Sequence, residues 1–343
     1  MAQLTYRPWR EGDDRTLLEL WGDAEGAAAE QFRGAFAPDA DGVAAHDGAA
    51  SAAAPGSTQV WRRCIVAEDQ GIPVAAAVVY RAVLHPQRLW AYVEVARDHR
   101  RAGVGSELLR RLRAAAASAP DEATGGGVKL RTKVTEGTPG KAFAEDAGFA
   151  LLQRSREVLV KPGVLKLPVL GDGTDAGDSS PLVEDLATGS VELSDAVGRY
   201  YAQVHAWDPP APISVGRAQQ LFLSDAAGAH GAVVLRAPAV SAFGAGATPS
   251  RKKGRLRAFA VSYAGPASAA AEQPSEVLLG HDVRLTPDDA QDAVRGLLAL
   301  IAYQHPVRLE IDDSMTALRA TVDPLLASGS AEQIGPAILT LGD

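Results

Sequence analysis

The chain has 343 residues, 46% of them hydrophobic, and its 34 lysines and arginines against 42 aspartates and glutamates give a net charge of −8. This length exceeds one small domain and suits two, and the single cysteine, Cys64, excludes an intrachain disulfide. The N-terminus shows no apolar signal core, and no run of about eighteen apolar residues occurs, so we expect a soluble cytoplasmic protein with no membrane partner.

Hydrophobic periodicity in the first half predicts a strand, two helices, a three-stranded meander, a helix, a strand, a helix and a final strand. The meander includes a hairpin turn at Asp69-Gln70-Gly71, and Gly148 ends the last helix. The expected strands are 4–7, 60–68, 74–83, 89–95, 128–134 and 151–160, and the expected helices are 15–24, 27–36, 104–117 and 139–147.

The second half repeats this order after a stretch rich in Pro, Gly and Asp. The expected helices there are 192–206, 215–224, 287–303 and 314–326, and the expected strands are 231–236, 255–263, 276–285, 307–311 and 338–341. We therefore predict an α+β fold in two domains, 1–162 and 183–343, joined by a linker at 163–182. Each domain would be a twisted mixed sheet flanked by helices.

The stretch from Leu89 to Ala117 predicts an anion site. An apolar strand is followed by a basic loop with Gly103 and Gly105 and then by an amphipathic helix. The free N–H groups of a helix N-terminus attract anions, and glycine lets the backbone approach them closely. Neither a Walker A loop nor a dinucleotide fingerprint fits well, because Ser106-Glu107 follows Gly105 and the third glycine position is Leu108.

The loop Arg100-Arg101-Ala102-Gly103-Val104-Gly105 resembles the [Q/R]-x-x-G-x-[G/A] signature of the GNAT superfamily of N-acetyltransferases. Ala147-Gly148-Phe149 and the order of elements resemble the same family. The resemblance implies a mostly antiparallel sheet and a loop that holds the pyrophosphate of acetyl-CoA. In the second half, Pro287 and three aspartates stand where the loop would be, so we expect a degenerate domain that does not bind CoA phosphates.

The resemblance also implies which residues would contact acetyl-CoA. The backbones of Val93, Val95 and Arg97 would pair with the pantetheine arm, and the N–H of Val95 would polarise the thioester carbonyl. The pyrophosphate loop would be formed by Arg100, Arg101, Ala102, Gly103, Val104, Gly105 and Ser106. The spacing of the histidines predicts no metal site.

The catalytic groups are less well defined. Glu94, the only carboxylate in the key strand, is a candidate base, and Tyr92 and Glu68 are others; water relaying to a distant carboxylate is an alternative. The tyrosine that often protonates the thiolate in the family aligns with Ala144, which leaves Ser106, Thr138 and Tyr92 as candidate donors. We expect Cys64 to be a buried structural thiol.

The predicted function is transfer of an acetyl group from acetyl-CoA to a primary amine of a small molecule or peptide. The acceptor would lie between the pantetheine channel and the loop at 25–58. Residues 1–165 hold 21 basic and 21 acidic residues, so the excess, 21 acidic against 13 basic, falls in residues 166–343. That acidic half argues against a nucleic-acid partner and suits a cationic amine. A homodimer is compatible with the sequence.

Two alternatives stay open. Ala144 favours a CoA-binding sensor or scaffold without turnover, and the helix N-terminus alone would also suit a nucleotide or a phosphosugar.

Overall fold

The computed structural model describes residues 4–24, 27–41, 61–120, 128–171, 180–238, 240–241, 251–252, 254–263 and 274–343. Most of the predicted loop at 25–58 lies outside these ranges. Within them, no helix is both long enough and apolar enough to cross a bilayer.

The chain forms two compact units. The N-terminal unit consists of residues 1–153, 208–211 and 338–343, and the C-terminal unit of residues 154–207 and 212–337. Each unit has its own hydrophobic core.

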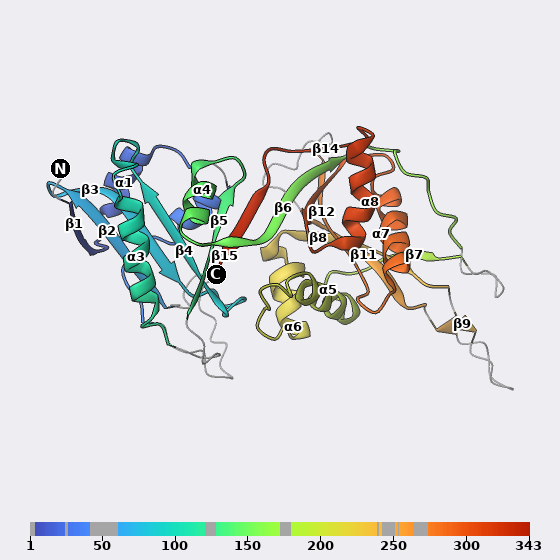
Figure 1. Ribbon diagram of the computed structural model, residues 1–343. Helices are drawn as coiled ribbons and strands as arrows, with labels where there is room; N and C mark the ends of the chain where they lie inside the picture. The colour runs from blue at the N-terminus through green and yellow to red at the C-terminus, as the bar shows by residue number, and fades with distance from the viewer. Residues whose placement is uncertain are drawn as a thin grey trace. The chain divides into compact units, whose positions relative to one another are not determined.

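The elements of the N-terminal unit follow the predicted order (Figure 1). They are β1 (Leu4–Pro8), α1 (Asp13–Trp21), α2 (Ala27–Arg33), β2 (Arg62–Asp69), β3 (Ile72–Tyr80), β4 (Arg88–Val95), the 3₁₀ turn η1 (Arg97–His99), α3 (Val104–Ala116), β5 (Lys129–Thr135), α4 (Pro139–Asp146) and β15 (Ile338–Gly342). Another strand, β6 (Ala150–Val160), starts in this unit and continues into the other.

The sheet of this unit has the order β1-β2-β3-β4-β5-β15. Neighbouring strands are antiparallel except for the parallel pair β4–β5. The predicted hairpin turn between β2 and β3 is confirmed, because Gln70 and Gly71 both have positive φ angles, 53° and 81°, as tight hairpin turns require.

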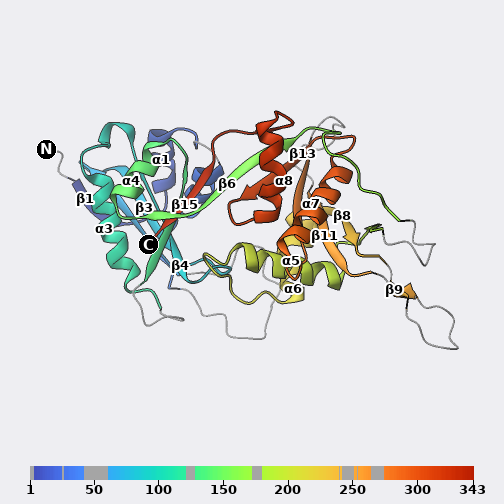
Figure 2. The ribbon, with the colours of Figure 1, turned by 45° about the vertical axis from the view of Figure 1, so that its right-hand side comes forward.

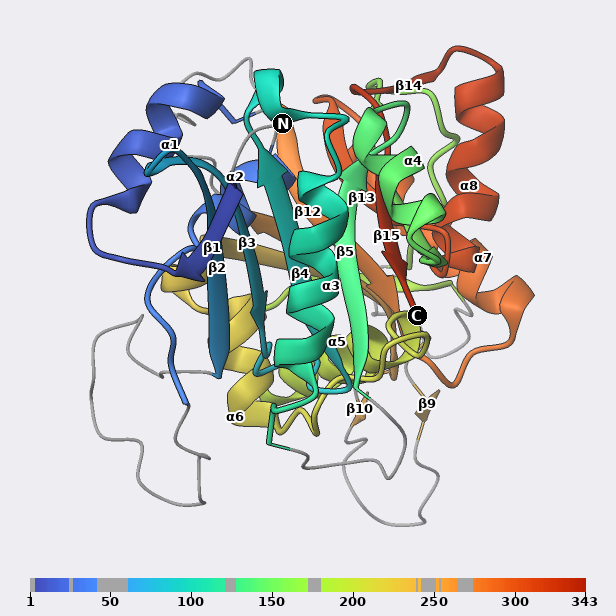
Figure 3. The same cartoon turned by 60° about the vertical axis from the view of Figure 1, so that its left-hand side comes forward.

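The two faces of this sheet carry different cores, because side chains alternate along each strand. Leu89 and Ala91 of β4 pack with α3 in one cluster. On the other face, Trp90 and Tyr92 contact Phe32 of α2, with ring centroids 5.5 and 4.8 Å apart. Figure 3 shows α3 lying across one face of the sheet. We call the opposite face, which carries Trp90 and Tyr92, the α2 face.

The C-terminal unit repeats the same plan, with α7 packed on β8, β11 and β12 (Figure 2). Its elements are β7 (Leu182–Asp185), α5 (Val191–Val204), α6 (Val215–Ala218), the π-helical turn η2 (Gln219–Leu223), the 3₁₀ turn η3 (Asp225–Ala227), β8 (Ala229–Arg236), β11 (Leu256–Tyr263), β12 (Ser275–His281), α7 (Pro287–Ile301), β13 (Val307–Asp312), α8 (Thr316–Ala327) and β14 (Ala331–Gln333). The short strands β9 (Val240–Ser241) and β10 (Arg251–Lys252) pair with each other.

Its sheet has the order β7-β8-β11-β12-β13-β6, and β14 also pairs with β6. Here too one pair, β12–β13, is parallel. The predicted fold class is therefore confirmed: a mixed, mostly antiparallel sheet flanked by helices occurs in both halves.

The last strand of each half pairs with strands of the other half. β15, at the end of the chain, pairs with β5 of the N-terminal unit, from Ile338 with Thr135 to Gly342 with Arg131 (Figure 3). Residues 155–160 of β6 pair instead with β13. The predicted domains, 1–162 and 183–343, were continuous segments, and the units differ from them in this respect. Hydrophobic alternation indicates that a segment is a strand, but it does not specify the strand's partner.

Candidate functional site

β4 and β5 pair over a short distance and then part. Their parallel pairing runs from Arg88 with Lys129 to Trp90 with Arg131, although β4 continues to Val95 and β5 to Thr135. Residues 91–95 of β4, which we call the unpaired edge of β4, therefore lack β5 as a ladder partner. Backbone groups left in this way are available to hydrogen-bond an extended ligand.

The backbone groups of Val93 and Val95 face this edge. The amide of the next residue, Ala96, donates to the carbonyl of Val74 in the neighbouring β3 at 2.9 Å. Since alternate residues of a strand point their N–H and C=O groups to opposite sides, those of Val93 and Val95 point away from β3. Arg100 Nε donates to the Val95 carbonyl at 2.9 Å, which agrees with this direction. These are two of the residues predicted to contact the pantetheine arm.

The predicted anion loop follows directly and has the backbone shape of an anion nest. Arg101 has a φ of 63° and Gly103 a φ of 80°, and α3 begins at Val104. Residues in this left-handed region turn successive amides toward one point. Gly103 has no side chain with which to cap α3, and Glu107 N donates to its carbonyl at 3.1 Å. The amides of Val104, Gly105 and Ser106 are thus left without partners inside the helix.

Positive charge surrounds this loop. The side chains of Arg97, Arg100 and Arg101 are exposed, as are those of Ala102 and Ser106. The one acid in the first turn of α3, Glu107, binds Arg110 and Arg111 at 2.7 and 2.8 Å. The hydrogen bond from Arg110 is the main cause that lowers the pKa of Glu107, to about 2. The acid is therefore neutralised by its neighbours rather than opposing an anion at the helix start.

One contact holds the loop against the sheet. His99 is partly buried, and its Nε2 lies 3.2 Å from Asp69 Oδ2 at the end of β2. A Cβ added to Gly105 would lie 3.5 Å from the Phe143 ring of α4 and 3.8 Å from Val95 Cγ2, an ordinary contact distance. Within the protein, position 105 thus has room for alanine.

The candidate base Glu94 is not a free carboxylate. Arg33 of α2 binds it with two nitrogens, Nε at 3.0 Å and Nη2 at 2.6 Å, and Tyr92 donates its hydroxyl to it at 2.9 Å. The third nitrogen of Arg33, Nη1, donates to the carbonyl of Gly22 at 2.6 Å. Glu94 therefore joins β4 to α2 and to the end of α1, which is the arrangement of a structural ion pair.

Tyr92 is held as a neutral phenol. Its ring stacks on Phe32 at 4.8 Å, and burial, followed by the charge of Glu94, raises its pKa far above the ordinary value. Since its proton is donated to Glu94, Tyr92 stabilises that carboxylate. It does not lie free to accept a proton at neutral pH.

The other candidate acid–base groups are also engaged. Glu68 receives Arg7 Nε at 2.6 Å, and Thr138 Oγ1 donates to the Thr135 carbonyl at 2.7 Å. Ala144 is buried in the cluster beneath α3. Cys64 is buried in the core of the α2 face, and its burial raises the pKa of the thiol, as expected of an inert structural cysteine.

The equivalent helix start in the C-terminal unit is closed. Thr286 caps α7, with its Oγ1 accepting from the amide of Asp289 at 3.3 Å. The Asp289 carboxylate accepts from Thr286 Oγ1 at 2.7 Å and from Arg257 Nη2 at 2.9 Å. Pro287, at the start of the helix, lacks an N–H. Protein groups therefore fill the positions that an anion would use.

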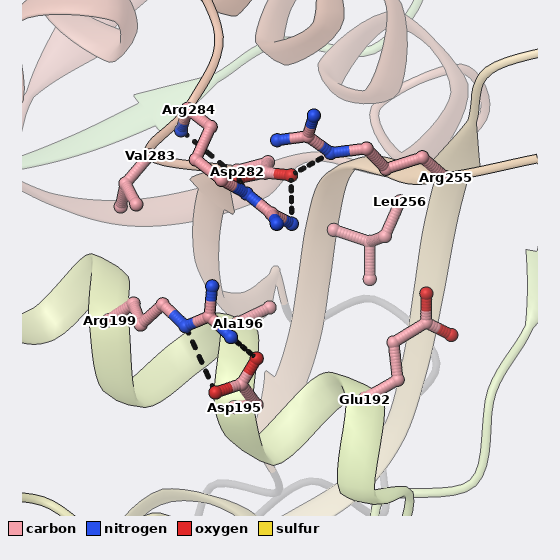
Figure 4. A pocket seen from close by; sticks show the side chains of 9 residues that line it. All are labelled: Glu192, Asp195, Ala196, Arg199, Arg255, Leu256, Asp282, Val283 and Arg284. Atoms are coloured by element: carbon pink, nitrogen blue, oxygen red, sulfur yellow. Dashed lines mark hydrogen bonds and ion pairs between the residues drawn. The ribbon is translucent and has the colours of Figure 1, made fainter.

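The C-terminal unit also has a small hollow beside α5 (Figure 4). Arg255 and Arg284 converge on Asp282 at 2.6 and 2.9 Å, and Arg199 pairs with Asp195. Because the opposite charges of this hollow bind each other, it presents no net charge to a ligand, and we assign no chemistry to it.

Two polar clusters of the N-terminal unit were not predicted. Arg33, which binds Glu94, carries no signal in the sequence, because its partner lies 61 residues away. The second cluster is centred on Asp208, which is fully buried and binds Arg88 at 3.1 Å and also Arg131. Asp208 lies far along the chain from both arginines, so the sequence gives no signal of this cluster either.

Comparisons with known proteins agree with the fold described above. Residues 60–151 match the family model of the acetyltransferase (GNAT) domain. The chain is similar to a GCN5-related N-acetyltransferase from Sphaerobacter thermophilus, with 13% identity, a TM-score of 0.52 and coverage of 99% of this chain and 95% of that chain. This similarity shows a shared fold. No curated protein matches the sequence.

Two further solved structures are similar at lower TM-scores. A tandem GNAT protein from the clavulanic acid biosynthesis pathway has 13% identity, a TM-score of 0.48 and coverage of 99% and 98%. An acetyltransferase from Pyrococcus horikoshii, described as putative, has 12% identity, a TM-score of 0.44 and coverage of 99% and 89%.

Proposed function

We propose that the chain is a member of the GNAT superfamily, whose acetyltransferase domain model matches residues 60–151, and that its N-terminal unit transfers an acetyl group from acetyl-CoA to a primary amine. The observation that carries this proposal is the unpaired edge of β4, which leads directly into the open N-terminus of α3. An extended pantetheine arm needs backbone partners along a strand edge, and the pyrophosphate at its end needs free amide groups such as those of a helix N-terminus.

The residues present fit acetyl-CoA. The amides of Val104, Gly105 and Ser106 would hold the pyrophosphate, with Arg100 and Arg101 adding charge and Gly103 supplying the left-handed turn that opens the nest. Val93 and Val95 would pair with the pantetheine amides through their outward backbone groups. Acetyl-CoA, when bound, supplies the activated thioester that the reaction requires.

The chain's own contribution to the chemistry is orientation and polarisation. The Val95 N–H, which points from the unpaired edge, would donate to the thioester carbonyl oxygen and stabilise the charge that develops there. We do not assign general-base catalysis to Glu94, because Arg33 and Tyr92 occupy its carboxylate. The acceptor amine would lose its proton to solvent before or during transfer, which requires no tightly placed base.

The C-terminal unit would not bind a second CoA. The capped start of α7, with Asp289 bound to Thr286 and Arg257, supports this part of the proposal. The expected stoichiometry is therefore one CoA per chain.

Two measurements on the full chain test the proposal. Isothermal titration with CoA should give one site per chain, while ATP and NAD should bind weakly or not at all. Acetyl-CoA mixed with a panel of primary amines should release free thiol in proportion to the acetylated amine, as followed by a thiol reagent and mass spectrometry. Stoichiometric binding of ATP in preference to CoA would contradict the proposal.

A CoA-binding sensor without turnover is the second candidate function. The observation that favours it is Ala144, a buried methyl group at the position where the resemblance places a proton-donating tyrosine. Tight CoA binding with no acetylated product from any amine in the panel would establish the sensor and reject the transferase.

A further inference from the structure

Lys133 stands apart among the charged side chains of the α2 face. It lies on β5, two residues beyond Arg131, where the pairing of β5 with β4 ends. It is half-buried, and its Nζ lies 5.7 Å from the centroid of the Trp90 ring, so it points to the same face as Trp90 and α2. Lys133 thus lies on the α2 face where β5 separates from β4, at the start of the unpaired edge whose far end, Val95, is proposed to bind the thioester carbonyl.

The positive charge of Lys133 is not balanced by an acid. Among the described residues, no carboxylate lies within ion-pair distance of its Nζ, and the contact with Trp90 is a cation–π interaction that leaves the formal charge in place. A half-buried ammonium group is less well hydrated than an exposed one, so an anionic partner would stabilise it.

Two acids on the side of the sheet that Lys133 faces are already bound by arginines. Glu94 is bound by Arg33 through two nitrogens, and the fully buried Asp208 is bound by Arg88 and Arg131. Each of these two acids is therefore bound by at least one guanidinium group, and neither forms an ion pair with Lys133.

We propose that the acetyl acceptor carries a carboxylate in addition to its amine, as an amino acid does, and that Lys133 binds this carboxylate. The inference rests on the proposed acetyltransferase function and names the class of acceptor. Lys133 would fix the end of the acceptor away from the amine, so that the amine reaches the thioester. It would take no part in proton transfer.

The test compares matched acceptors on the full-length protein. A set of amino acids is assayed beside their carboxamides, which have the same amine and side chain but no negative charge. Because a hydrogen bond to a charged group is worth about a tenfold change or more, the carboxylate acceptors should show a kcat/KM at least about tenfold higher. Most of this difference should appear in KM, since the contact is uniform binding.

Two variants separate Lys133 from a general effect of charge. Lys133→Met should bring the ratio between carboxylate and carboxamide acceptors close to one, and Lys133→Arg should keep most of it. Lys129→Met, which removes an exposed lysine from the other end of the same strand, should leave the ratio unchanged. CoA titration and thermal unfolding of each variant verify that the unit is folded.

The outcomes distinguish this inference from the function on which it rests. Acetylation of both classes with equal efficiency, or an unchanged ratio in Lys133→Met, would overturn the role of Lys133 and leave the acetyltransferase in place. Absence of acetyl transfer to every acceptor, despite CoA binding, would overturn the proposed function and this inference with it.

Discussion

The two units contain the same succession of a strand, a turn and a helix, but the N-terminus of the helix is open in one unit and capped in the other. At the start of α3, Gly103 and Arg101 are left-handed, no side chain caps the helix, and arginines surround it. At the start of α7, Thr286 caps the helix and Asp289 binds Arg257. A shared fold therefore does not bring a shared site, since a few residues at one helix end decide whether it receives an anion.

The same comparison applies to the parallel strand pairs. β4–β5 pairs over three residues and β12–β13 over two before the strands separate. The separation of the two parallel strands is thus a property of the fold in both halves, and it does not by itself mark a binding site.

Leu341 is fully buried in β15 and packs in the core beneath α3. Leu341→Asp would bury an unpaired charge there, at a cost of ~5 kcal/mol or more, which is comparable to the stability of a domain. We expect loss of CoA binding and of the unfolding transition of the N-terminal unit, as measured by titration and calorimetry. Leu151→Asp, at a strand position that is 55% exposed, is the control and should have little effect.

Gly103→Val would place a β-branched residue at a φ of 80°. The left-handed conformation costs an ordinary residue about 1–2 kcal/mol, so the nest should rearrange and the CoA dissociation constant should rise by about tenfold or more. The matched variant Gly189→Val changes a glycine of the C-terminal unit with ordinary φ and open space around it. Equal CoA affinity for both variants would show that the loop at 100–106 does not hold the coenzyme.

Glu94→Gln tests the difference between a structural and a catalytic carboxylate. Loss of the ion pair with Arg33, whose side chain is 11% exposed, should cost ~2–3 kcal/mol in the free energy of unfolding. Acetyl transfer should fall by less than about tenfold, whereas loss of a general base costs about 10²–10⁴. Arg33→Met should lower stability to a similar extent. If Glu94→Gln lowers the rate of acetyl transfer much more than Arg33→Met does, the result would indicate a catalytic role for Glu94.

The turn before α7 should make the C-terminal unit sensitive to acid. Burial opposes ionisation of Asp282, but hydrogen bonds from Arg284 and Arg255 outweigh it and hold its pKa below the ordinary value. A depressed folded pKa stabilises the protein above the unfolded pKa of about 3.9, and this contribution is lost as the pH falls below it. Unfolding midpoints between pH 6 and pH 3 should fall less steeply in Asp282→Asn than in the wild type.

Much of the fold could be predicted from the sequence, because the apolar periods are clear. The hairpin at Gln70-Gly71, the helix that begins near Val104 and the repeated order of elements all agree with the structure. The position of α3 after β4 followed from local pattern alone.

The remaining features depend on contacts between residues far apart in the chain. The pairing of Arg33 with Glu94, the burial of Asp208 against Arg131 and the exchange of β15 have no local signature, because either partner alone looks like an ordinary surface or strand residue. In the sequence, Glu94 is notable as the only carboxylate of its strand. Only the structure shows that Arg33 of α2 binds this carboxylate.

The placement of β15 has a consequence for synthesis on the ribosome. Residues 338–342 complete the sheet of the N-terminal unit beside β5, yet they are translated after the C-terminal unit. Domains usually fold in the order in which they emerge, but here the N-terminal unit must wait until the C-terminal unit and β15 have left the exit tunnel. The gene therefore cannot be cut between its two halves to give a self-sufficient enzyme, and any attempt to express the first half alone must supply this strand.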